Sequence, residues 1–365
     1  TNYGEPSENI VELKPKNIKL HKMLHRYSKK QGILDFYNLE SFNIPNYKAF
    51  KNADLVHLHN LHGAYFSPFV LPYLTSLKPV VWTLHDEQAY TGHCSYAFEC
   101  NKWLTGCENC PDLNFYPKIK KDTTEFLIQT KKKIYDLSDF TIACTSHWLA
   151  DRVKQSILGG KNIRVIYNGI DEKVFNPTAK PYAMKMLDLP VNKKILLFSA
   201  SGSINNPQKG GKYIIEAYNR LKNNDDYLFI NLGAEKAGSK KNWLDIPYIH
   251  DERKLALYYS AADLFIYPSQ AEVFGLVIAE AMSCQTPVIA FNNSAVPELV
   301  SHMETGYLAE NKNIDDFVNG IKIFMEKDDI RNKAGVRARE RVLEKFTLDR
   351  MVNEYINLYE EKLGK

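Results

Sequence analysis

A buried strand followed by a glycine-containing loop and an apolar helix places two glutamates where a ligand could bind. Pro268–Ala290 has the sequence PSQAEVFGLVIAEAMSCQTPVIA, with Glu272 in the expected loop and Glu280 in the second turn of the helix. Gly275 lets the backbone approach a ligand closely, and the N–H groups at a helix start suit a phosphate. A charge in an apolar helix is costly unless it has a partner or faces a cleft. The pattern favours an anion-binding site; the plain alternative is that Glu272 caps the helix and Glu280 lies on the surface.

Polar residues also follow two strand-like runs in the first half of the chain. Ligands of open α/β sheets bind beyond the carboxyl ends of the strands. These ends hold His59, His62 and Gly63 after one run, and His85 and Asp86 after the next. No G-x-x-x-x-G-K-[ST] loop and no G-x-G-x-x-G after a strand is present, so the sequence supports neither a kinase-type P-loop nor the usual NAD fingerprint. A lone histidine at a strand end is more often an ordinary polar residue, so its context must decide.

Cysteines are concentrated in one loop. Four of them lie within 17 residues with the spacing C-x5-C-x6-C-x2-C: Cys94, Cys100, Cys107 and Cys110. Four thiolates suit a tetrahedral structural zinc, although the first gap is unusual. Free thiols, disulfides, which a cytosolic location disfavours, and an iron–sulfur cluster remain alternatives. Cys144 and Cys284 adjoin apolar runs and are expected in the core.

The elements that must position these residues are buried strands. Apolar runs predict strands in two series, the first at 53–59, 79–85, 140–145 and 163–167, and the second at 195–201, 227–232, 262–267 and 287–291. Continuous apolar runs separated by helical patterns are typical of parallel strands in βαβ units. Two such series predict an α/β protein with two doubly wound halves.

A chain of 365 residues is long enough for two domains. The prolines and small residues of Asn176–Tyr182 favour a boundary there, so we predict an N-terminal domain at 1–178 and a C-terminal domain at 179–345. The amphipathic segment 346–365 is expected to form a helix that packs back on the N-terminal domain. Residues 1–50 contain no buried strand with a glycine turn, so the N-terminal domain is expected to lack its first βα unit. The alternative is an unusual N-terminus with a sheet one strand short.

Composition excludes several classes of protein. Apolar residues make up 44% and charged residues 25%, which excludes collagen, coiled coil and disorder. No apolar run is long enough for a spanning helix, and the first residues do not predict a signal peptide. The net charge of +4 is too small to indicate a nucleic-acid-binding protein, but it suits anionic substrates or an anionic membrane surface.

The segment around the two glutamates resembles the E-x7-E donor-site motif of retaining glycosyltransferases of family 4, which have the GT-B fold. The resemblance extends through the motifs YYSAADLFIYPS, PVIA, PEL and TGYL, through YNGID at Tyr167–Asp171 and through Gln208–Gly210. The first half is similar to a branch of that family acting in capsule, colanic-acid and exopolysaccharide synthesis. The residues that carry this second similarity are HLHNLHG at 57–63, PVVWTLHD at 79–86, the cysteine loop at 91–110 and TSHW at 145–148.

This resemblance implies two Rossmann-like domains facing across a cleft, with a nucleotide-diphosphate sugar bound mostly by the second domain. The residues expected to bind this donor are Lys209, Gly210, Glu272, Val273, Phe274, Gly275, Leu276 and Glu280. Lys209 matches the lysine on the diphosphate, where a fixed cation stabilises the leaving group. Glu280 matches the residue on the ribose hydroxyls, and Glu272 the residue that faces the transferred sugar.

His85 matches the family histidine beside the sugar and the acceptor, so the expected catalytic residues are His85, Glu272 and Lys209. The residues expected on the acceptor side are His59, His62, Gly63 and Asp86. Family members often have an arginine a few residues before the lysine. Here Ser203 and Ile204 occupy that region, which leaves one phosphate-binding cation unassigned.

The expected function is that of a retaining hexosyltransferase. It would move a sugar from a nucleotide-diphosphate sugar to a glycan or lipid-linked acceptor in cell-surface polysaccharide synthesis. We expect no cofactor requirement for catalysis, no nucleic-acid partner, and a cytoplasmic location with peripheral contact at the inner face of the cell membrane. A GT-B sugar-nucleotide epimerase and a truncated, non-catalytic binding protein are the alternatives.

Overall fold

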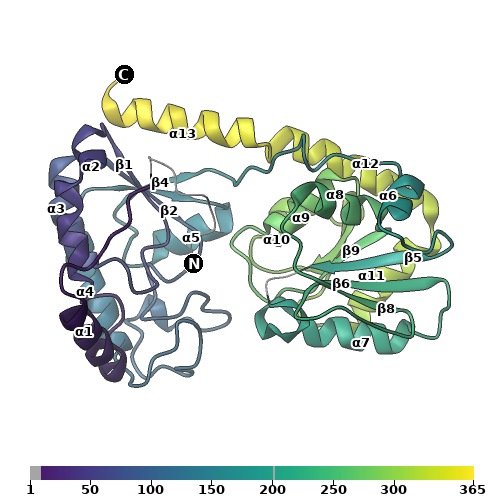
Figure 1. Ribbon diagram of the computed structural model, residues 1–365, viewed down its shortest axis with the longest axis horizontal. Coiled ribbons are helices and arrows are strands. Elements are labelled where there is room, and N and C mark those ends of the chain that lie inside the picture. Colours follow the sequence, from purple (N-terminus) through teal and green to yellow (C-terminus); the bar gives the residue numbers. More distant parts are fainter. Residues whose placement is uncertain (1–9, 200–201) are drawn as a thin grey trace. The chain divides into compact units, whose positions relative to one another are not determined.

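The computed structural model describes residues 10–199 and 202–365. The chain forms two compact α/β units (Figure 1). Unit 1 comprises the chain as far as Ile166 together with Ile356–Lys365, and unit 2 comprises Tyr167–Tyr355. The last two residues of the strand predicted at 195–201 lie outside the described residues.

Unit 1 is built on a parallel sheet with the strand order β1-β2-β3-β4. Its strands are β1 (Val56–Leu58), β2 (Val80–Leu84), β3 (Thr141–Cys144) and β4 (Asn162–Val165). Its helices are α1 (Ile18–Gln31), α2 (Lys48–Asn52), α3 (Leu71–Leu77), α4 (Thr124–Asp136) and α5 (His147–Gln155). Every residue of β2 and β3 is buried, as expected for apolar runs inside a parallel sheet. All four strands predicted in this half are confirmed.

Between residue 10 and β1, the described chain forms α1, the 3-10 helix η1 (Leu39–Asn46) and α2, and it contains no strand. Two further 3-10 helices follow in this unit, η2 (Pro68–Val70) and η3 (Lys102–Leu104). A long loop that contains η3 and the four clustered cysteines connects β2 to α4.

Unit 2 is built on a larger sheet with the strand order β11-β10-β9-β5-β6-β8-β7. Its strands are β5 (Lys194–Ser199), β6 (Tyr227–Ala234), β7 (Gly238–Lys240), β8 (Trp243–Pro247), β9 (Leu264–Tyr267), β10 (Val288–Phe291) and β11 (Gly306–Ala309). Neighbouring strands are parallel except for the pair β7 and β8. The four strands predicted in this half, β5, β6, β9 and β10, are confirmed within their described residues, whereas β7, β8 and β11 were not predicted.

The helices of unit 2 are α6 (Lys180–Met186), α7 (Gly211–Leu221), α8 (Glu252–Ala261), α9 (Leu276–Ser283), α10 (Val296–Leu299), α11 (Ile314–Glu326) and α12 (Asp328–Lys345). The last helix, α13 (Leu348–Leu363), has residues in both units. Across the described part of the chain, no helix combines the length and apolarity that crossing a membrane requires.

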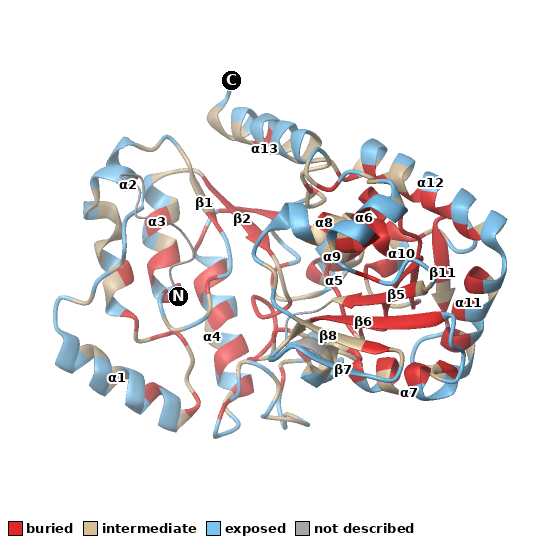
Figure 2. Ribbon diagram, turned by 45° about the vertical axis from the view of Figure 1, so that its right-hand side comes forward, coloured by how far each residue is buried: buried red, intermediate tan, exposed pale blue. Residues whose placement is uncertain are grey.

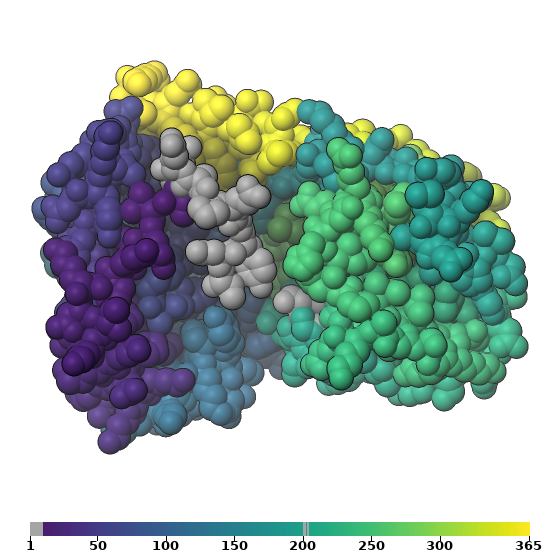
Figure 3. Space-filling view, in the orientation of Figure 1, coloured from purple at the N-terminus to yellow at the C-terminus, as the bar shows by residue number. Residues whose placement is uncertain are grey.

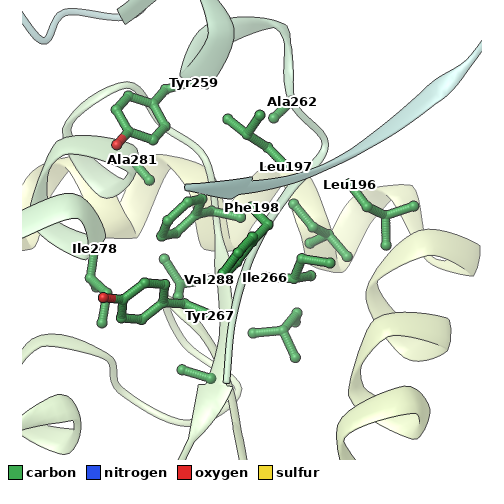
Figure 4. Close-up of a cluster of buried hydrophobic side chains, with 14 of the residues drawn as sticks. Leu196, Leu197, Phe198, Tyr259, Ala262, Ile266, Tyr267, Ile278, Ala281 and Val288 are labelled. Carbon is green, nitrogen blue, oxygen red and sulfur yellow. The ribbon is translucent and has the colours of Figure 1, made fainter. Parts of the chain in front are cut away.

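The core of unit 2 lies where the central strands meet α8 and α9 (Figure 4). Leu197 and Phe198 from β5 and Ile266 from β9 are at most 1% exposed, as are Ile278 from α9 and Val288 from β10. Burying a side chain of this size stabilises the fold by about 1.5–3 kcal/mol. The tight core therefore provides a rigid base for the loops that follow β5 and β9.

Strand order reverses between β5 and β9. From β5 the chain continues to β6 on one side, whereas β9 pairs with β5 on the other side. Connections that leave neighbouring parallel strands in opposite directions open a crevice at the carboxyl edge, where α/β proteins bind ligands. The topology thus singles out the loops after β5 and β9.

The boundary between the units corrects the prediction. The chain passes from unit 1 to unit 2 at Tyr167, well before residue 178. The Tyr167 ring packs against Phe274 and Phe346, with ring centroids 6.1 and 5.3 Å apart. Phe175 is buried and packs against Tyr259. Pro177 lies in a loop of unit 2 and Pro181 in the first turn of α6, and the aromatic residues that precede them already belong to the core of this unit.

The C-terminal helix also differs in extent from the prediction. Only Ile356–Lys365, rather than all of 346–365, groups with unit 1. There the Tyr359 hydroxyl lies 2.6 Å from His57 Nδ1, and the Glu361 carboxylate accepts from Arg164 at 2.8 Å. The space-filling view shows the end of the helix, in yellow, against residues of unit 1, in purple and blue (Figure 3).

Candidate active site

The loops after β5 and β9 touch through their backbones. The Gln270 N–H donates to the Gln208 carbonyl at 2.8 Å. Gly210 has φ +75°, and a Cβ there would come within 1.8 Å of the Pro268 carbonyl oxygen. A larger residue would push the loops apart, so this glycine permits the close approach.

This approach joins Lys209 to Glu272. Lys209 ends the 3-10 helix η5 (Pro207–Lys209), and its Nζ lies 2.5 Å from Glu272 Oε1. The same oxygen accepts hydrogen bonds from the Tyr267 hydroxyl and from Ser269 Oγ, each at 2.8 Å. Glu272 is only 5% exposed. One cation and two hydroxyls therefore compensate the buried carboxylate, as burial of a charge requires.

Tyr267 and Ser269 were not predicted as partners of Glu272. Tyr267 is the last residue of β9, and its ring lies in the core (Figure 4). The signal available in the sequence was position: a hydroxyl side chain that ends a buried strand adjoins the carboxyl edge of the sheet.

Glu280 lies on α9 and contacts a different tyrosine. The Tyr259 hydroxyl donates to Glu280 Oε2 at 2.9 Å, and Tyr259 is fully buried. Burial raises the pKa of Glu280 to about 7, although the hydrogen bond from Tyr259 acts in the opposite direction. Glu280 therefore titrates near neutral pH, which is typical of carboxyl groups at functional sites.

The start of α9 decides between the interpretations of Glu272. Gly275, with φ +103°, precedes the first helical residue, and no side chain caps this end. Glu272 therefore does not cap the helix, and Glu280 is partly buried rather than on the open surface. An uncapped helix start presents backbone N–H groups to an anion.

The remaining residues expected at the donor differ in what they expose. Val273 and Phe274 have buried side chains, with 6% and 1% exposure. Any contribution they make to a ligand must come from the backbone. Leu276 is 45% exposed and can present its side chain. Their roles stay predictions, as does the unassigned phosphate-binding cation; Ile204 is described, but the Ser203 side chain is not.

In unit 1 the predicted histidines form two contacts. His59 Nδ1 lies 2.9 Å from His85 Nε2, and His62 Nε2 lies 2.6 Å from Asp86 Oδ2. Gly63, next to His62, has φ +108°. The structure thus brings together the residues that follow β1 and β2, because these strands pair in parallel.

The two histidine contacts have opposite electrostatic character. Burial lowers the pKa of His59 and of His85, and the proximity of the two rings lowers that of His85 further. Burial also opposes protonation of His62, but the hydrogen bond and charge of Asp86 outweigh it and raise the pKa of His62. The pair His59–His85 therefore favours neutral rings, whereas His62 favours the cation.

The four clustered cysteines are unpaired thiols. Gly92 N–H donates to Cys107 Sγ at 3.2 Å, and Cys110 Sγ lies 3.5 Å from His93 Nε2. Burial raises the pKa of Cys94 to about 12 and that of Cys107 to about 11. Within the described residues, no three His, Cys, Asp or Glu side chains are placed to hold a metal ion, so the zinc site stays a prediction. The two other cysteines, Cys144 and Cys284, are buried as predicted.

Two family profiles match the chain, "Glycosyl transferases group 1" at residues 182–341 and "Glycosyltransferase Family 4" at residues 21–174. A protein named as a colanic acid biosynthesis glycosyl transferase, WcaC of Escherichia coli K12, is 26% identical over 261 residues, which cover 67% of this chain and 62% of that protein. The N-acetyl-alpha-D-glucosaminyl L-malate synthase of Bacillus anthracis is 25% identical over 232 residues, which cover 61% and 60%. The chain thus spans about three-fifths of the length of these relatives.

Solved structures agree with this grouping at the level of the fold. Sucrose-phosphate synthase of Thermosynechococcus elongatus matches 94% of this chain and 79% of its own, with a TM-score of 0.67 and 20% identity. HepE of Anabaena, solved in complex with UDP, matches 86% and 80%, with a TM-score of 0.62 and 18% identity. Since both units are Rossmann-like and the two profiles cover most of the sequence, the chain belongs to glycosyltransferase family 4 and has the GT-B fold.

Proposed function

We propose that this protein is a retaining hexosyltransferase that moves a sugar from a nucleotide-diphosphate sugar to a glycan or lipid-linked acceptor in cell-surface polysaccharide synthesis. The observation that carries the proposal is the cluster of Lys209, Glu272, Tyr267 and Ser269 at the reversal of strand order in unit 2. HepE of Anabaena has been solved with UDP and with UDP-glucose, which supports a donor of this class.

In the proposed donor site, each charged side chain has one task. Lys209 binds the diphosphate and stabilises the negative charge that develops on it as the bond to the sugar breaks. Glu280, as a carboxylate, accepts hydrogen bonds from the ribose hydroxyls, and Tyr259 holds it in place. The backbone at the start of α9 donates to phosphate or sugar oxygens.

Glu272 is proposed to contact the transferred sugar. It is held by Tyr267 and Ser269, whose hydroxyl groups can keep its position when Lys209 turns to the diphosphate. A carboxylate with fixed partners can orient a sugar hydroxyl at small entropic cost. In this proposal, Lys209 pairs with the Glu272 carboxylate before the donor binds and with the diphosphate of the donor afterwards.

On the acceptor side, we assign His85 to the sugar and the acceptor, with His59, His62, Gly63 and Asp86 around it. In the proposed reaction, the bond from the anomeric carbon to the diphosphate oxygen breaks, and the acceptor oxygen forms its bond on the same face. The acceptor proton passes to a phosphate oxygen of the departing diphosphate. Replacing His85 with alanine should slow transfer without lowering the unfolding temperature, because His85 follows the buried strand β2.

Nucleotide diphosphate release, measured with and without an acceptor, tests this function. Acceptor-dependent release with a glycosylated product of retained configuration is the expected result. Release or isomerisation of the donor sugar without an acceptor would point to an epimerase. Nucleotide binding without either reaction would point to a non-catalytic binding protein.

We also propose that α1 contacts an anionic membrane surface at the cytoplasmic face, where a lipid-linked acceptor would lie. Leu20, Met23 and Tyr27 lie on one side of α1 and are 39%, 58% and 50% exposed. The neighbouring side of the helix carries Lys19, Lys22, Arg26, Lys29 and Lys30, and the helix contains no acidic residue. Figure 2 shows α1 as largely exposed. Basic helices with exposed apolar residues bind anionic lipid surfaces.

Cosedimentation with vesicles tests the membrane contact. The parent chain should bind phosphatidylglycerol vesicles but not phosphatidylcholine vesicles. Its binding to phosphatidylglycerol should weaken as the salt concentration increases. Lys22→Glu with Arg26→Glu should abolish binding. Lys333→Glu with Arg337→Glu, an equally spaced exposed pair on α12, is the matched control and should retain it. Equal loss in both pairs, or no binding by the parent, would contradict the contact.

A further inference from the structure

A tyrosine near the end of α13 contacts His57, for which the sequence left open a place on the acceptor side or a plain packing role at the strand end. Within unit 1, the Tyr359 hydroxyl lies 2.6 Å from His57 Nδ1, and the two rings meet edge to face with centroids 5.7 Å apart. The two residues are 302 positions apart in the chain. The contact therefore exists only when the end of α13 lies on unit 1.

The other side of His57 is held by the sheet. His57 Nε2 lies 2.7 Å from the Thr83 hydroxyl on β2, and Thr83 is 1% exposed. A neutral imidazole has one N–H donor and one acceptor nitrogen. The Thr83 and Tyr359 hydroxyls can each donate or accept, so both nitrogens of His57 have a partner in either tautomer and the ring is held in one orientation. Burial, together with the nearby His59 and His85, lowers the pKa of His57 to about 4, so the ring is neutral at pH 7.

His57 is the first of three histidines in contact. Successive side chains of a strand alternate between its faces, so His57 and His59 share a face of β1 and its extension. Their ring centroids are 4.1 Å apart. The His59 ring stacks on His85 at 5.2 Å, and His59 Nδ1 lies 2.9 Å from His85 Nε2. Displacement of the His57 ring would therefore shift the His59 ring and, through it, the His85 ring.

We propose that Tyr359 is a positioning residue that fixes His57 and, through His59, sets the orientation of the His85 ring. The inference rests on the function proposed for His85. The C-terminal helix thereby becomes part of the acceptor-side chemistry of unit 1, although no residue of α13 needs to touch a substrate. One hydrogen bond typically makes a modest net contribution, so removing the hydrogen bond between Tyr359 and His57 should reduce the rate of sugar transfer without abolishing it.

Tyr359→Phe tests the proposal because it keeps the ring and removes only the hydroxyl. Its kcat should fall by about three- to tenfold, while the KM for the donor stays at the parent value and the unfolding temperature falls by no more than about 2–4 °C, the effect of losing one hydrogen bond. Glu361→Gln is the matched control, because it weakens the 2.8 Å contact with Arg164 on the same helix without approaching the histidines. It should keep the parent kcat.

Two further measurements separate positioning from a general loosening of the helix. Combining Tyr359→Phe with His85→Ala should give no slower transfer than His85→Ala alone, since the two residues act through one path. Nitrogen-15 NMR of the imidazoles should show altered signals for His57 and His85 in Tyr359→Phe and parent signals in Glu361→Gln.

Several outcomes would overturn the proposal. A kcat for Tyr359→Phe equal to that of the parent would do so, as would equal losses in Tyr359→Phe and Glu361→Gln. Unchanged imidazole signals in Tyr359→Phe would also refute it, whether or not the parent transfers sugar. A parent chain without transferase activity would instead refute the proposed function, so the two failures are distinguishable.

Discussion

Lys209 Nζ lies 2.5 Å from Glu272 Oε1, although the two residues are 63 positions apart in the chain. The ion pair joins the loop after β5 to the loop after β9. A cation held by a carboxylate next to an uncapped helix start is well placed to exchange that carboxylate for a diphosphate. Lys209 and Glu272, both expected to bind the donor, thus also form an ion pair with each other.

Replacing Lys209 with alanine should remove the cation that stabilises the leaving group. The expected loss in kcat/KM corresponds to about 2–4 kcal/mol of transition-state stabilisation, with weaker binding of nucleoside diphosphate. Steady-state kinetics and calorimetric titration measure the two effects. Lys333→Ala, which changes an exposed lysine of the same unit, is the control. Parent-like turnover and affinity in Lys209→Ala would refute the assignment.

The two glutamates should separate binding from transfer. Glu280→Ala should mainly weaken nucleotide binding, since the ribose loses its acceptor. Glu272→Ala should mainly lower kcat and leave the affinity for free nucleotide near that of the parent, since its proposed partner is the sugar. Comparing the Kd for nucleoside diphosphate with kcat in both variants checks this division. Identical patterns in the two variants would show that the assignment of separate roles is wrong.

Glu280 should make stability depend on pH. Its pKa rises from 4.5 to about 7 on folding, so between these values the folded chain holds a proton that the unfolded chain has released. The free energy of unfolding contributed by this group therefore falls as pH increases from 4.5 through 7. The side chain in Glu280→Gln has no carboxyl group and stays neutral at every pH in this range. The difference between the unfolding temperatures of Glu280→Gln and the parent should therefore increase in favour of the variant from pH 5 to pH 8. If the two proteins show the same dependence of unfolding temperature on pH, the prediction is wrong.

Metal content tests the cysteine loop. If Cys94, Cys100, Cys107 and Cys110 bind structural zinc, protein purified without added metal should contain about one zinc per chain. Binding must bring the thiols together and release their protons, because no three of the four are placed as ligands in the described structure. Removing the metal should then increase hydrogen exchange in residues 91–110 while nucleotide binding to unit 2 persists. A metal-free chain whose four thiols react freely when folded would exclude the site, and iron would indicate a cluster.

Local sequence patterns were sufficient for the strands and for the glutamate motif. Continuous apolar runs such as 264–267 and 288–291 are typical of strands in a buried parallel sheet, where both faces of each strand are covered. Glu280 interrupts an apolar helix, and that break in the pattern already indicated a carboxylate with a partner. Short, weakly patterned strands such as β7, with all of its residues exposed, left no comparable signal.

The unit boundary shows where local patterns mislead. Prolines near residue 178 predicted the end of a domain, but Tyr167 and Phe175 already pack in unit 2. Turn-forming residues report where the backbone bends. A boundary is instead defined by which core the side chains enter, and that depends on residues far along the chain, such as Phe346.

By itself, the sequence determined which residues could do chemistry: Glu272 and Glu280, the lysine before two glycines, and the histidines at strand ends. Only the tertiary structure decided their partners. Lys209 meets Glu272 because strand order reverses between β5 and β9, and Tyr359 meets His57 because the chain returns to unit 1 at its end. The physical reason is that hydrogen bonds and ion pairs act over about 3 Å. Contacts that short depend on how distant segments pack, which no local pattern of residues contains.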